Sequence, residues 1–97
     1  MKANIPKVKV KFFASMSDVF QEKEREIELE RASNIRELLE FLCNTYERRQ
    51  RIFDQSGQIR ADVTILKNGR HIYFLDGIQT ELKEGDTIAI FPPVYGG

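Results

Sequence analysis

The last two residues of the sequence, Gly96 and Gly97, are those best suited to chemistry, and they follow the segment Phe91-Pro92-Pro93-Val94-Tyr95. A diglycine end has no Cβ atoms, so it can enter a narrow channel and present the α-carboxylate of Gly97 to a buried active site. The two prolines favour an extended, stiff exit of this tail from the body. The pattern predicts a carboxyl terminus that acts inside a partner, and a frayed terminus is the alternative.

Two single residues are further candidates. Cys43 is the only cysteine, and it could be a sulfur-carrying thiol. It lies beside the apolar stripe of a predicted helix, however, where a free cysteine behaves as a small buried hydrophobe. His71 is the only histidine, and we expect it to be a solvated loop residue. The sequence has no phosphate-binding loop, dinucleotide fingerprint or zinc-binding pattern, so we expect no metal site and no bound cofactor.

Composition narrows the classes of protein that fit. The 97 residues are 41% hydrophobic, which suffices for one compact domain, and 15 basic residues balance 15 acidic ones. This balance does not favour binding to nucleic acid or to a membrane surface. No apolar run approaches the roughly 20 residues of a membrane span, and we expect a cytoplasmic protein. We interpret the acidic run 22–30 and the basic group 48–51 as solvated faces, although the basic group could dock an acidic partner.

Two segments near the N-terminus have the period of strands. Residues 8–13 and 25–30 alternate apolar and charged side chains, as half-buried strands do. The intervening residues 14–21 contain Ser and Asp, and we expect a loop there. The two strands should pair, and their inward residues should be Val8, Val10, Phe12, Ile27 and Leu29.

The period then changes to that of a helix. The apolar residues that share one helical face are Ile35, Leu38, Leu39 and Leu42. Either Ser33 or Asn34 can cap this helix, with Glu37 placed for a capping box. Tyr46 could extend the apolar face. Near the C-terminus of the helix, where its dipole favours positive charge, we expect Arg48, Arg49 and Arg51.

The second half of the chain predicts two more strands, residues 63–67 and 87–91, which are rich in β-branched and apolar side chains. Asn68-Gly69 is a strong hairpin signal. Residues 70–75 fit either a short strand or an irregular segment. The order of elements predicts an α+β domain, in which one main helix packs across a mixed sheet and the last strand lies beside the first.

Residues 82–97 are similar to the ending of the MoaD/ThiS family of ubiquitin-like sulfur carriers. Within that family, the Phe-Pro-Pro-Val-x-Gly-Gly ending most resembles the small subunit of molybdopterin synthase. Residues 8–14 and 34–39 also resemble the first strand and the helix start of the family. The resemblance implies a β-grasp fold, with a domain over residues 1–91 and an extended tail over 92–97.

The same resemblance implies a chemistry for Gly97. An E1-like (MoeB-like) enzyme would use ATP to adenylate its carboxylate, and sulfur would then replace AMP to leave a thiocarboxylate. The resemblance favours a sulfur-donating role beside the large subunit of molybdopterin synthase, and we do not expect the chain to catalyse alone. Three alternatives stay open: a sulfur carrier for thiamine, cysteine or another pathway, a ubiquitin-like protein modifier, and a plain interaction module.

The alternation of the strands also predicts a docking surface. Phe13 falls on the outer face of the sheet if Val8, Val10 and Phe12 face inward, and Phe91 falls on the same outer face. We therefore expect an apolar patch at the start of the tail, with partial burial by the protein's own loops as the alternative. The predicted partner-binding residues are Phe13, Phe91, Pro92, Pro93, Val94 and Tyr95.

Overall fold

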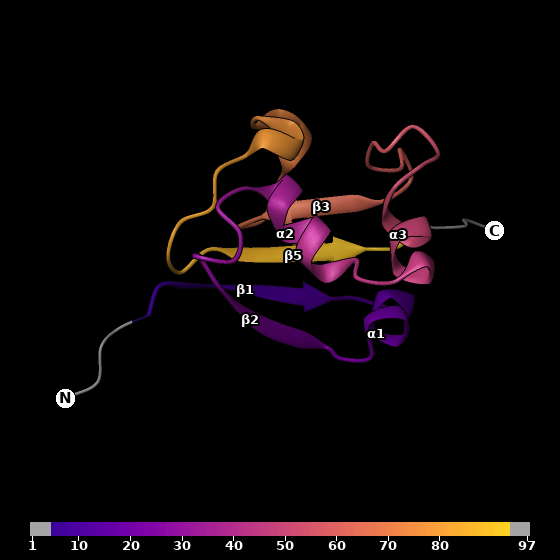
Figure 1. The fold of residues 1–97 in the computed structure, drawn as a ribbon. Coiled ribbons are helices and arrows are strands. Elements are labelled where there is room, and N and C mark those ends of the chain that lie inside the picture. The colour runs from indigo at the N-terminus through magenta and orange to yellow at the C-terminus, as the bar shows by residue number, and fades with distance from the viewer. Residues whose placement is uncertain (1–4, 94–97) are drawn as a thin grey trace.

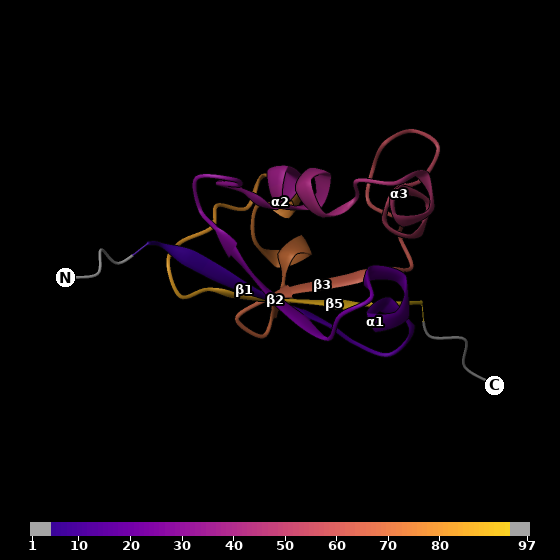
Figure 2. The ribbon, with the colours of Figure 1, turned by 60° about the horizontal axis from the view of Figure 1, so that its bottom comes forward.

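The computed structural model describes residues 5–93, so Val94, Tyr95, Gly96 and Gly97 lie outside the described residues. Five strands form one mixed sheet in the order β2-β1-β5-β3-β4, and α2 packs across one of its faces (Figures 1 and 2). No helix within residues 5–93 is long and apolar enough to cross a membrane. The elements are β1 (Lys7–Phe12), α1 (Ser15–Phe20), β2 (Glu24–Glu28), α2 (Ile35–Leu42), α3 (Tyr46–Ile52), β3 (Thr64–Lys67), β4 (Arg70–His71), the 3-10 helices η1 (Ile72–Phe74) and η2 (Gly77–Gln79), and β5 (Thr87–Phe91).

The pairing of the strands agrees with the prediction. β1 runs antiparallel to β2, with Val8 opposite Ile27, and parallel to β5, with Val10 opposite Ile88. β5 in turn pairs antiparallel with β3. Alternate residues of the strands point into the core, because successive side chains of a strand face opposite sides of the sheet. The buried ones include Val8, Val10, Phe12, Ile27, Ile65, Ile88 and Ile90.

The main helix forms where its apolar period predicts it. Asn34 is the N-cap, and its Oδ1 accepts a hydrogen bond from the Glu37 N–H at 2.8 Å. Glu37 Oε1 accepts in return from the backbone N–H and the hydroxyl of Ser33, at 2.8 and 2.9 Å. These bonds from Ser33 lower the pKa of Glu37. The buried face of α2 carries the four predicted residues, Ile35, Leu38, Leu39 and Leu42.

The prediction of a loop over residues 14–21 is wrong, because Ser15–Phe20 form helix α1. Met16 and Phe20 are four residues apart, so they lie on one helical face, and both are buried. Phe20 also stacks on Phe12, with ring centroids 4.6 Å apart. Tertiary burial of this pair outweighs the weak helix preference of the intervening Ser and Asp residues.

The predicted extension of α2 to Tyr46 is also wrong. The helix ends at Leu42, and Tyr46 begins a separate helix, α3, where its side chain is 76% exposed. Thr45 caps α3 by accepting from the Arg48 N–H at 3.2 Å. The basic residues therefore lie within α3, and the last turn of that helix carries Arg49 and Arg51.

Residues 70–75 were predicted to form either a short strand or an irregular segment, and the structure contains a short strand followed by a 3-10 turn. Asn68 and Gly69, with φ of 51° and 83°, form the tight turn into the two-residue strand β4, and η1 follows it. Asn68 also ties this turn to the start of β5. Its Nδ2 donates to Asp86 Oδ1 at 2.8 Å, and its Oδ1 accepts from the Thr87 N–H at 2.9 Å.

Asp86 is the buried centre of this network. Its Oδ2 accepts from the Lys83 N–H at 2.8 Å and lies 3.4 Å from Lys67 Nζ. Burial alone would raise the pKa of Asp86. The hydrogen bonds from Asn68 and Lys83, together with the charge of Lys67, outweigh burial and hold the pKa below its ordinary value of 3.8.

The Asp86→Asn variant should lower the free energy of unfolding by about 1–2 kcal/mol at neutral pH. Both carboxylate oxygens accept hydrogen bonds, and an amide keeps only one acceptor oxygen, so the bond from Asn68 or the bond from Lys83 is lost. Since the pKa of the carboxyl is depressed in the folded state, its contribution is present at neutral pH and is lost as the pH falls through the folded pKa. The gap between wild type and variant in urea unfolding should therefore close below about pH 4. A gap that is independent of pH would contradict the role of the carboxylate charge.

Candidate functional site

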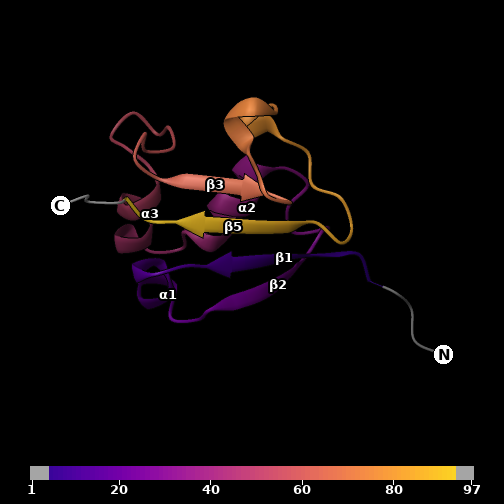
Figure 3. The same ribbon diagram turned by 180° about the vertical axis from the view of Figure 1, so that it is seen from behind.

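The tail begins at the end of β5, where α1 and α3 also lie (Figures 1 and 3). The backbone there is held on both sides. On one side Phe91 is paired with Thr64 of β3, and on the other the Phe13 N–H donates to the Ile90 carbonyl at 3.0 Å. Pro92 and Pro93 follow directly and are half-buried, and they cannot donate to the sheet. The sheet therefore fixes the position from which the tail starts.

The structure brings Phe13 and Phe91 together, as the alternation of the strands predicted. Their rings stack with centroids 4.5 Å apart and an angle of 7° between the planes. Both rings lie on the outer side of the sheet, since the neighbouring Phe12 and Ile90 are buried in the core. Phe13 is 39% exposed. An apolar surface thus adjoins Pro92 and Pro93, and its role in docking stays a prediction.

A strained residue, Ala14, follows Phe13 directly and was not predicted from the sequence. It has φ of 50° and ψ of −132°, a conformation that a residue with a Cβ rarely adopts. Ala14 joins β1 to α1, and we call it the joint. The carbonyls of Phe13 and Ala14 both accept hydrogen bonds from α1: that of Phe13 accepts from the Met16 N–H, and that of Ala14 accepts from the Ser17 hydroxyl. Alanine carries no sequence signal for such a conformation, so only the structure could reveal it.

Cys43 is a core residue in the structure. It is 3% exposed and belongs to the apolar cluster that also contains the buried face of α2. Burial raises the pKa of the Cys43 thiol to about 12. The thiolate is the form that reacts, so a thiol with this pKa is almost entirely unreactive at neutral pH. The geometry supports a structural role for Cys43 and not a sulfur-carrying one.

His71 is not the solvated loop residue that we expected. It ends strand β4 and is half-buried, and its Nδ1 accepts a hydrogen bond from the Tyr73 N–H at 2.9 Å. Its ring packs edge-on against those of Tyr73 and Phe74. One ring nitrogen of His71 is therefore engaged in a hydrogen bond that stabilises the turn of η1. Within residues 5–93, no group of three or more His, Cys, Asp and Glu side chains could hold a metal ion.

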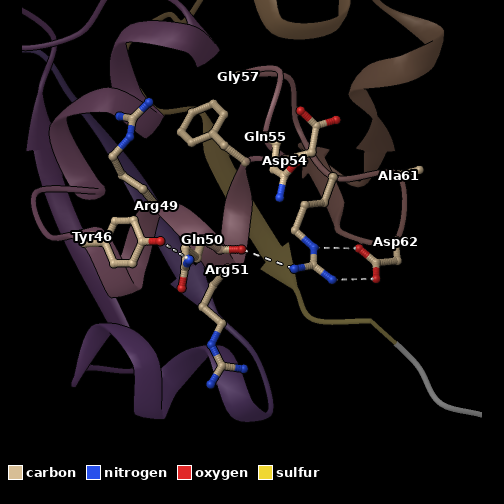
Figure 4. Close-up of a pocket in the computed structure, with 11 residues that line it drawn as sticks. Tyr46, Arg49, Gln50, Arg51, Asp54, Gln55, Gly57, Ala61 and Asp62 are labelled. Carbon is tan, nitrogen blue, oxygen red and sulfur yellow. Dashed lines mark hydrogen bonds and ion pairs between the residues drawn. The ribbon is translucent and has the colours of Figure 1, made fainter.

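A hollow of about 1130 Å³ lies between α3 and the segment 53–62 (Figure 4). Two of its arginines are engaged with neighbours. Arg60 donates to both carboxylate oxygens of Asp62, at 3.1 and 3.0 Å, and to the Gln50 carbonyl at 3.2 Å. Arg49 pairs with Glu40 at 2.7 Å and covers the ring of Phe53. These contacts brace the loop, and of the predicted site residues that the structure describes, Phe13, Phe91, Pro92 and Pro93 do not line the hollow.

A sequence profile of the ThiS family matches residues 10–97. The chain belongs to the ThiS family. Its fold is accordingly the ubiquitin-like β-grasp, in which one helix crosses a mixed sheet. The resemblance to the MoaD/ThiS family is therefore confirmed over most of the chain.

Relatives of the chain include two proteins that are named as modifiers. It is 31% identical to small archaeal modifier protein 3 of Haloferax volcanii, covering 93% of this chain and 98% of that protein. The solution structure of small archaeal modifier protein 1 from Methanosarcina acetivorans is 29% identical, with a TM-score of 0.78, and the match covers 98% and 100% of the two chains.

A third relative has a name that points to molybdopterin. It is the "putative molybdopterin converting factor, subunit 1" of Pyrococcus furiosus, which is 34% identical with a TM-score of 0.67, and the match covers 92% of this chain and 99% of that one. The chain is thus a member of a family of ubiquitin-like sulfur carriers and modifiers.

Proposed function

We propose that the chain is a sulfur carrier that works through Gly97, as the small subunit of molybdopterin synthase. An E1-like enzyme adenylates the Gly97 carboxylate, and sulfur then replaces AMP to give a thiocarboxylate. The observation that carries the proposal is the diglycine ending of a ThiS-family chain. Its tail starts from a strand held on both sides, beside the partly exposed pair Phe13 and Phe91.

The chemistry assigns the activation to a partner. A carboxylate is a poor electrophile until an oxygen of it attacks the α-phosphorus of ATP, which releases pyrophosphate and forms an acyl-adenylate. Sulfide (HS⁻) then attacks the acyl carbon, so that a C–S bond forms, the C–O bond to AMP breaks, and a thiocarboxylate remains. The sequence has no phosphate-binding loop, so the chain supplies the substrate carboxylate and the E1-like enzyme supplies the nucleotide site. A large synthase subunit would receive the tail and hold the pterin precursor.

The relative from Pyrococcus furiosus supports the molybdopterin pathway, because its name refers to a molybdopterin converting factor. The Phe-Pro-Pro-Val-x-Gly-Gly ending supports the same choice. A second candidate is a protein modifier, which is favoured by the similarity to small archaeal modifier protein 3. In that case the activated Gly97 would be joined to a lysine amine of a target protein. Both functions share the adenylation step and differ in the nucleophile that then replaces AMP, which is sulfide for a carrier and a lysine amine for a modifier.

For docking, we propose the surface formed by Phe13, Phe91, Pro92 and Pro93, which we call the tail-root patch, together with Val94 and Tyr95. The patch is apolar and lies where the tail leaves the sheet. A partner that covers it would remove the exposed faces of two aromatic rings from water, which is a common source of binding energy. The same contact would direct the tail toward the partner's active site.

The activation step is tested by ATP–pyrophosphate exchange with the E1-like enzyme of the source organism. Wild-type chain should support exchange, and a variant that lacks Gly97 should not, because the acyl group would then be misplaced. Cell extracts distinguish the modifier hypothesis from the carrier hypothesis, because only a modifier forms higher-mass conjugates that depend on Gly97. Exchange that is unaffected by the deletion would overturn the proposal.

The Phe91→Asp variant should raise the KM of the chain in that exchange about 10-fold or more, because it places a charge in the centre of an apolar contact. The matched control is Phe74→Asp, which alters a 75%-exposed aromatic residue on η1, outside the tail-root patch. Thermal unfolding should show that both variants are folded. An equal effect of the two substitutions, or an unchanged KM for Phe91→Asp, would exclude the patch as the docking surface.

A further inference from the structure

We propose that Arg48 is a positioning residue, which binds the C-terminal end of α1 and thereby holds Phe13 in the tail-root patch. We call this contact between Arg48 and α1 the latch. This inference rests on the proposed function for its effect on partner binding. Arg48 lies in α3, far from β1 in the sequence, yet its guanidinium reaches the end of α1. Within the described residues, its side-chain hydrogen bonds go to Val19, Phe20 and Asn44 and not to Pro92 or Pro93, so we infer that it acts through α1.

The guanidinium satisfies the open end of α1. Its Nε donates to the Val19 carbonyl and its Nη2 donates to the Phe20 carbonyl, both at 3.3 Å. Carbonyls in the last turn of a helix have no partner within the helix, and positive charge is favoured there. The N–H groups of Gln21 and Glu22 do not replace Arg48 at these carbonyls, since both donate to the Ser17 carbonyl instead.

Two further contacts fix the orientation of Arg48. Its Nη1 donates to Asn44 Oδ1 at 3.1 Å, and its guanidinium lies 5.4 Å from the ring centroid of Phe20. The planar fork thus bridges two carbonyls while its face covers an aromatic ring. A lysine ammonium can supply the charge but cannot reproduce the fork and the stacked plane together.

The connection from α1 to the patch is short and strained. Only Ala14 separates Phe13 from the first residue of α1, and Ala14 holds a conformation that persists only where the surrounding structure imposes it. On one side of the joint, the Phe13 N–H is bonded to Ile90 of β5. On the other side, α1 has only six residues, too few to be stable without tertiary contacts. The contacts of Arg48 with α1 therefore help to impose the strained joint that sets the direction of the Phe13 ring.

The Arg48→Lys variant tests the latch, and Arg51→Lys is the matched control. Arg51 lies in the same helix and is exposed. The first measurement needs no partner: NMR should show that Arg48→Lys weakens the contacts between the Phe13 and Phe91 rings and speeds amide exchange at Met16 about 10-fold, because the joint is released. Thermal unfolding of the variants shows that the rest of the fold is kept.

The second measurement is ATP–pyrophosphate exchange with the E1-like enzyme. Arg48→Lys should raise the KM of the chain about 5-fold at unchanged kcat, since it disturbs binding and not the reacting carboxylate. In a Phe13→Leu background the same substitution should have little further effect, because the latch acts through that ring.

Three results would overturn the latch. The ring contacts and the exchange at Met16 could be unchanged in Arg48→Lys, the KM shift could persist in full in the Phe13→Leu background, or Arg51→Lys could raise the KM equally. The last result would assign the effect to a basic docking surface on α3. If the wild-type chain is not activated at all, the proposed function fails, and the NMR comparison still decides the latch.

Discussion

The structure depends on the burial of β5 between β1 and β3. Ile88 and Ile90 have no exposed surface, and they pack with the inward residues of both neighbouring strands and with the apolar face of α2. Truncating buried side chains of this size typically costs about 2–5 kcal/mol, a large share of the stability of a small domain. The residue that follows them, Phe91, is therefore fixed in place. A tail can be presented accurately only if the strand from which it starts does not move.

The regular part of this fold could be predicted from the sequence because one physical pattern determines it. Where charged and apolar residues alternate, or apolar residues recur with the helical period, a single buried face follows, and this predicted β1, β2 and α2. The strands β3 and β5 were predicted from their β-branched and apolar composition. The same reasoning did not predict helix α1. Two buried residues, Met16 and Phe20, are too few to establish a period, and the contacts that decide its conformation come from β1 and from Arg48. The break between α2 and α3 was missed because Tyr46 continues the apolar period while its side chain remains in water.

The candidate site likewise has one feature that the sequence predicted and others that it did not. The stacking of Phe13 on Phe91 followed from strand alternation, which is a local property of the sequence. The strain at Ala14 and the reach of Arg48 to α1 are properties of the folded chain, and no local pattern signals either of them. Arg48 was interpreted only as part of a basic group, because its partners are backbone carbonyls that any sequence would supply. The sequence already favoured a buried, structural Cys43, and the structure agrees, since burial of the thiol removes its reactivity.

The central claim is that the chain carries sulfur on Gly97, and the intact mass of the protein purified from its own cells tests it most directly. Wild-type protein should include a form heavier by the exchange of one oxygen for sulfur. The Cys43→Ser variant should retain that form, and a variant that lacks Gly97 should lose it. A sulfur adduct that disappears in Cys43→Ser, or that persists without Gly97, would contradict the account.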